Sequence, residues 1–155
     1  VVSVESYPSA SRTRRLRLLR LRLDDTPCQI PRENETFEIP AKTAHFEKFG
    51  VTYDGENPSQ FQFREYGEIV LMGGHIHPDE GGEGVNMFLN GKLFRNLYPS
   101  TTNNFSWWQK SPYQFARHRI AKGDSVSLSA VYSNPRATPL RGSVMGMLVF
   151  YFSPD

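Results

Sequence analysis

Short runs of β-branched and aromatic residues, separated by Gly, Pro, Asn and Asp, recur along the whole chain. Apolar residues almost nowhere repeat at helical spacing, whereas residues 125–131 alternate polar and apolar positions as a half-buried strand does. The pattern therefore predicts an all-β protein. The expected strands, with ends good to about three residues, cover residues 14–23, 35–39, 44–53, 60–71, 84–89, 92–98, 114–120, 125–132 and 144–152.

Two turn signals divide the second half of the chain. Asn90-Gly91 lies between two extended runs and is typical of a type I′ hairpin, in which both central residues take positive φ. The segment 122–124, Lys-Gly-Asp, predicts a second tight turn. About eight to nine strands with short connections and no internal repeat favour a single antiparallel β-sandwich or jelly roll over residues 1–155. Residues 1–12 are expected to form an irregular N-terminal arm.

Length and charge narrow the range of functions. A chain of 155 residues fits one domain with one core, and 22% charged residues with a net charge of +2 describe an ordinary globular protein. The basic run at 12–22 alternates Arg with Leu, as a strand with one charged face does, and no aromatics interleave with it. We therefore expect no nucleic-acid partner. No apolar run approaches the roughly 20 residues of a membrane span.

Two imidazoles stand two residues apart in the segment 73–78, Gly-Gly-His-Ile-His-Pro. They follow the apolar run 68–72, which predicts a buried strand. Residues two apart in an extended chain point to the same face, so His75 and His77 could reach one metal ion or one polar ligand. Two strand-end histidines that bond to the backbone are the simpler alternative.

A second candidate donor comes from the last expected strand. Met145 and Met147 share one face of this strand by its period of two. A thioether beside two imidazoles is a soft donor set that suits copper, Cu(I) above all, better than magnesium or calcium. We expect Met145 to be the third ligand and Met147 to fill the core.

These segments together resemble a known family. The pair His75 and His77, the Asn-Gly hairpin, the 122–124 turn and the run 142–151 are similar to the second domain of the copper type II, ascorbate-dependent monooxygenases. That group contains peptidylglycine and dopamine β-monooxygenase, and the stress-upregulated nodulin-like proteins are closer still. The resemblance implies a jelly roll that binds one copper ion through His75, His77 and Met145.

The sequence also departs from this family in two ways that bear on its function. The monooxygenases hold a second copper ion with three histidines of a preceding domain, whereas this sequence has only His45 and His118 besides the pair. Hydroxylase chemistry is therefore not expected from this chain alone, and whether it is an enzyme stays open. The acidic segment after the pair contains Glu80 and Glu83, and a carboxylate ligand would shift the preference toward zinc or another divalent metal.

Three interpretations follow. The first is a copper-binding sandwich, used for copper handling or within a larger oxidative or cell-surface assembly. The second is a cupin-like metalloenzyme, although the glutamates lie three and six residues after His77, one residue away from the cupin spacing on either side. The third is a structural or adhesive interaction module without metal. A protein partner or a homo-oligomer and an extracellular or cell-surface location are expected, and Cys28, the only cysteine, has no partner within the chain for a disulfide.

Overall fold

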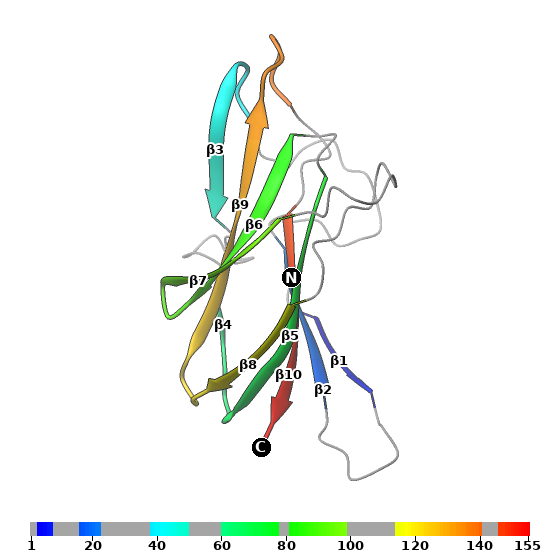
Figure 1. Ribbon diagram of the computed structural model, residues 1–155, viewed down its shortest axis with the longest axis vertical. Helices are drawn as coiled ribbons and strands as arrows, with labels where there is room; N and C mark the ends of the chain where they lie inside the picture. Colours follow the sequence, from blue (N-terminus) through cyan, green and yellow to red (C-terminus); the bar gives the residue numbers. More distant parts are fainter. Residues whose placement is uncertain are drawn as a thin grey trace.

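The protein is built from antiparallel strands throughout the part that the structure describes (Figure 1). The computed structural model describes residues 3–7, 16–22, 38–49, 60–77, 81–98, 114–140 and 146–155. Within these residues there are ten strands: β1 Ser3–Tyr7, β2 Leu16–Arg22, β3 Thr43–Phe49, β4 Gln60–Gln62, β5 Gly67–Ile76, β6 Gly82–Leu89, β7 Lys92–Leu97, β8 Gln114–Ile120, β9 Ser125–Asn134 and β10 Gly146–Pro154.

The strands form two sheets with the connectivity of a jelly roll. One sheet has the order β1-β2-β10-β5-β8, and the other has the order β3-β9-β6-β7, with the short β4 also paired to β9. Without β1 and β4, these are two four-stranded sheets, β2-β10-β5-β8 and β3-β9-β6-β7, in which nearly every neighbour comes from a distant part of the chain. This is the strand order of a jelly roll. The predicted β-sandwich is therefore confirmed.

The core lies between the two sheets and is made by alternate positions of the long strands. Leu148 and Phe150 of β10 face Val85 and Met87 of β6 across one continuous apolar cluster. Phe63 joins this cluster, with its ring centroid 4.8 Å from that of Phe152. Because the even positions of β10 point inward, its odd positions, Met147 among them, lie on the outer face of the sheet.

Strand ends agree with the sequence pattern except at three places. The single strand expected over 60–71 is two strands, because the chain leaves β9 after Gln62 and enters the other sheet at Gly67. The N-terminal arm was expected to be irregular, but Ser3–Tyr7 form β1, antiparallel to β2. Of the strand expected at 35–39, the described part is a single bridge between Ile39 and Leu140. The other residues of that expected strand lie outside the described residues.

The two predicted turns meet at one end of the sandwich. Asn90 and Gly91 have φ values of 50° and 74°, as the type I′ hairpin requires, and Gly123 has a φ of 98°. The Asn90 side chain donates to Asp124 Oδ1 at 2.8 Å and accepts from the Ser125 amide at 2.8 Å. The hydrogen bond from Asn90 to Asp124 and the one from the Ala121 amide lower the pKa of the Asp124 carboxyl. One asparagine thus joins the β6–β7 turn to the start of β9.

The arginine-rich strand β2 is an inner strand of its sheet. It lies between β1 and β10, with Leu19 and Leu21 in the core. Arg17 forms an ion pair with Glu65. Arg17 lies opposite the core residue Phe152, on the same face as Leu19 and Leu21, so the alternation of Arg and Leu changes face between Leu18 and Leu19. None of the described segments forms a helix with the length and apolar character needed to cross a lipid bilayer.

Candidate metal centre

The two histidines lie at the C-terminal end of β5, on the outer face of its sheet. The alternate residue Gly74 points inward, where an added Cβ would lie 3.1 Å from the Leu97 Cβ and 3.2 Å from the Val85 Cβ. Such contacts are tighter than side chains ordinarily tolerate, so the opposite sheet approaches β5 closely here. Because Gly74 faces the core, His75 and His77 project to the other side. Glycine at this position therefore lets the strand pack while it presents both imidazoles outward.

The imidazoles of this pair converge on each other. Their Nε2 atoms are 3.0 Å apart, their ring centroids are 4.9 Å apart, and the ring planes are nearly perpendicular at 84°. His75 is buried, with 3% of its surface exposed, and His77 is half-buried. The same-face geometry predicted from the spacing is thus observed. The role of the pair as metal ligands stays a prediction.

Two chemical states account for this short contact. In one, a neutral imidazole donates its Nε2–H to the Nε2 lone pair of the other, so the tautomers of the two rings differ. In the other, both Nε2 lone pairs bind one cation. Nitrogens that share an ion through bonds of about 2.0–2.1 Å lie roughly 2.8–3.4 Å apart for angles between right and tetrahedral, and the observed 3.0 Å falls within this interval. The residues present therefore fit a metal ion.

A methionine lies beside the pair, although not the one that the sequence favoured. Met147 of β10 is the direct cross-strand partner of His75 in β5. Opposed residues of an antiparallel pair carry their side chains on the same face, with Cβ atoms about 4.5–5.5 Å apart. Met147 is half-buried and is not part of the core cluster, so the expectation that it fills the core is wrong. Met145 lies outside the described residues.

The remaining candidates do not gather around the pair. Glu83 is exposed in β6, a strand of the other sheet, and makes no hydrogen bond or ion pair within the described part of the chain. His45 is exposed in β3, and His118 of β8 packs against the Phe94 ring with centroids 4.7 Å apart. Glu80 lies outside the described residues. The carboxylate that a cupin-like site would need is therefore not contributed by Glu83.

Imidazole, thiolate and carboxylate side chains do not by themselves complete a metal site around the pair. Across the segments with described positions, no three or more His, Cys, Asp and Glu side chains form a group that could hold a metal ion. That set of residue types does not include methionine. A third protein ligand to the pair would therefore be a sulfur from β10 or from the residues just before it, or would come from outside the described residues.

Comparisons with known proteins give little beyond this geometry. No protein-family model matches the sequence, and no curated protein matches it. Among solved structures, the chain is similar to a family 35 carbohydrate-binding module from Clostridium thermocellum, with a TM-score of 0.38 and 8% sequence identity. The match covers 84% of this chain and 90% of the module. Likeness at this level carries no functional argument, so function has to be inferred from the chain's own residues.

Proposed function

We propose that this chain is a copper-binding β-sandwich domain that holds the ion with His75, His77 and one methionine sulfur. The observation that carries the proposal is the 3.0 Å approach of the two Nε2 atoms. At this separation on one face, the two Nε2 atoms can share one ion through bonds of ordinary metal–imidazole length. Neutral imidazole is the form that binds metals.

The donor set supports copper. Met147 lies opposite His75, and a thioether is a poor ligand for hard cations but stabilises Cu(I). The sequence resemblance to the copper domain of the monooxygenases, in which Met145 would be the sulfur ligand, points to the same ion. Zinc is the main competitor, because it also accepts two imidazoles. The methionine is therefore the feature that separates the two ions.

The burial of the pair suits copper binding or handling rather than free exchange with solvent. His75 is almost fully covered, whereas His77 is half-buried, so an ion would enter from the side of His77. A bound copper ion supplies one-electron redox chemistry. The protein would contribute fixed imidazole positions and a partly dry surrounding, either alone or in a larger oxidative or cell-surface assembly outside the cell.

The test is metal content followed by affinity. The purified protein is analysed for metals by plasma mass spectrometry and then titrated with Cu(I) against a chromogenic chelator, with Zn²⁺ in parallel. We expect one copper per chain in the parent and a loss of at least about 100-fold in Cu(I) affinity for His75→Ala and for His77→Ala. His45→Ala, which removes an exposed histidine of β3, is the matched control and should bind as the parent does. Equal binding by all four proteins would contradict the proposal.

One alternative rests on the same contact. If the 3.0 Å approach is a direct hydrogen bond between two neutral rings, the pair is structural and the domain is an interaction module without metal. The pair would then stabilise the fold, and His75→Ala would lower the melting temperature of metal-free protein. Under the copper proposal, added copper raises the melting temperature of the parent and this stabilisation is lost in His75→Ala, whereas a module without metal shows no such stabilisation.

A further inference from the structure

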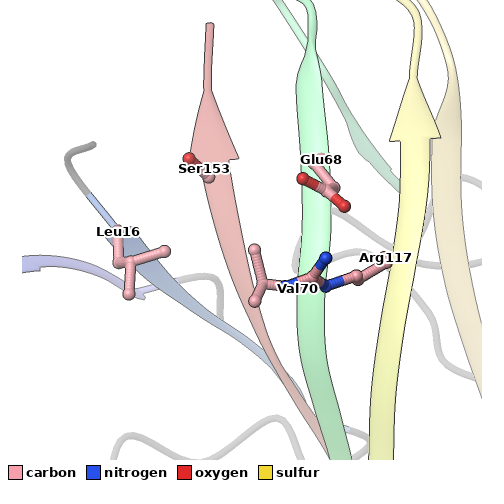
Figure 2. A pocket seen from close by; sticks show the side chains of 5 residues that line it. All are labelled: Leu16, Glu68, Val70, Arg117 and Ser153. Carbon is pink, nitrogen blue, oxygen red and sulfur yellow. The ribbon is translucent and has the colours of Figure 1, made fainter.

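A second candidate site lies on the same outer face, at the opposite end of β5 from the histidines. It is a surface pocket of about 320 Å³. Figure 2 shows that its side chains come from four adjacent strands of one sheet. The lining residues are Leu16 of β2, Ser153 of β10, Glu68 and Val70 of β5, and Arg117 of β8.

Irregular pairing on both sides of β5 shapes this pocket. The register between β5 and β8 shifts between Ile69 and Leu71, and the register between β10 and β5 shifts at Tyr151. Arg117 lies in the first irregularity with a φ of 42°, in the left-handed region that residues with a Cβ rarely occupy. Bulges are common beside functional sites because they redirect a side chain. Here the Arg117 side chain extends across β5 toward Val70 (Figure 2).

Two neighbouring arginines of β8 differ in how their charges are used. Arg119 binds Asp155 with two hydrogen bonds of 2.8 and 2.6 Å. Arg117 is exposed and makes no hydrogen bond or ion pair with any described residue. Its planar guanidinium therefore offers a pair of parallel N–H donors, the arrangement that a carboxylate accepts. Arg117 is therefore the cationic group of the pocket.

The other lining residues restrict what kind of anion fits. Glu68 places a carboxylate in the same pocket, and it would repel a ligand that is only anionic. Leu16 and Val70 add an apolar floor, and none of the described lining residues is an aromatic ring on which a sugar could stack. A ligand that matches all of these groups carries a carboxylate, a cationic donor and an apolar part.

We propose that this pocket binds a free apolar α-amino acid as its zwitterion. The carboxylate of the ligand pairs with Arg117, its ammonium group pairs with Glu68, and its side chain lies on Leu16 and Val70. The buried Ser153 hydroxyl, which has no hydrogen-bond partner among the described residues, is one further polar group at the edge of the site. A volume of about 320 Å³ lies at the small end of ligand pockets and suits a molecule of this size.

The test is a calorimetric titration of the full chain with leucine, with N-acetyl-leucine, which lacks the cation, and with leucine amide, which lacks the carboxylate. We expect saturable leucine binding with a dissociation constant below about 1 mM. Each blocked ligand should bind at least about tenfold more weakly, because each loses one charge-assisted pair. Absence of saturable leucine binding, or equal binding of the blocked forms, would each overturn the proposal.

Variants of the lining residues test whether leucine binds in this pocket. Arg117→Gln and Glu68→Gln should each weaken leucine binding by about tenfold or more. Arg64→Gln, which removes an exposed arginine before β5, should not change it. Circular dichroism spectra and melting curves identify a variant that fails to fold. If one of the two pocket variants fails to fold, leucine binding by the other tests the proposal. Leucine binding that survives in both folded pocket variants would show that the ligand binds elsewhere, and His75→Ala should leave it intact.

Discussion

The outer faces of the two sheets use polar side chains in different ways. On the sheet that contains β9, Asn96 donates to Asn86 at 2.7 Å, and Asn86 and Ser129 both donate to Glu47. This row crosses β7, β6, β9 and β3 and satisfies its own hydrogen bonds. The outer face of the other sheet carries the His75 and His77 pair and the guanidinium of Arg117, which pairs with none of the described residues. A polar face whose groups bond to one another contributes to stability, whereas groups that converge at an accessible surface can bind a ligand.

The largest effect is expected from substitution of Gly74, which faces the core so that the two histidines face outward. Gly74→Val would push a branched side chain against Leu97 and Val85, whose Cβ atoms already lie 3.1 and 3.2 Å from the position of an added Cβ. We expect a loss of about 3 kcal/mol in the free energy of unfolding, measured by urea denaturation. Gly74→Ala should cost about 1 kcal/mol, because only the Cβ must be accommodated. A valine variant as stable as the parent would show that the sheets do not approach closely there.

A substitution at Glu47 tests the row of hydrogen-bonded side chains on the sheet that contains β9. Replacing Glu47 with Ala removes the acceptor shared by Asn86 and the fully buried Ser129. The free energy of unfolding should fall by about 1–3 kcal/mol, the cost of buried donors that lose their partner. Glu47→Gln, which keeps one acceptor oxygen, should recover part of this loss. Cu(I) affinity should stay unchanged in both, and a fall in affinity would mean that the two faces are coupled.

Substitutions of the two methionines test whether a sulfur atom completes the histidine site on the outer face of the other sheet. Met147→Ile keeps the side-chain volume nearly constant and removes the sulfur that lies across from His75. If Met147 is the donor, Cu(I) affinity falls about 10- to 100-fold, while Zn²⁺ affinity changes much less. Met145→Ile is the matched variant, since the sequence resemblance assigns the ligand to Met145. Should neither variant weaken Cu(I) binding while His75→Ala does, the site is formed by imidazoles without sulfur.

The smallest expected effect concerns pH. The hydrogen bonds to Asp124 lower the pKa of its carboxyl below the ordinary value, so the stabilisation from Asp124 is complete above about pH 4. It is lost as pH falls through the folded-state pKa. Because the carboxyl is largely solvated, the contribution should be below about 0.5 kcal/mol. The acid-induced fall in melting temperature should be slightly shallower for Asp124→Asn than for the parent.

The sequence predicted features that depend on near neighbours along the chain. The bounds of β8, the Asn90-Gly91 hairpin and the shared face of His75 and His77 follow from local periodicity and turn chemistry. The break between β4 and β5 was missed because Phe63 is held by backbone bonds with Gly123 and Asp124, residues from a distant turn. The same limit applies to the site. The register that places Met147 opposite His75, and the bulge that turns Arg117 over β5, are set by pairing between distant strands.

The position of β10 between β2 and β5 has a consequence for the order of folding. Leu148 pairs with Leu21 on one side and with Gly74 on the other, so the sheet that carries the histidines closes only when the last of the described strands inserts. Pairings between segments so far apart in the chain form slowly, because much chain entropy is lost before they contribute any stability. His75 and Met147 therefore meet late. If these two side chains bind copper, the ion can be held only after β10 has paired, and the metal would not template the fold.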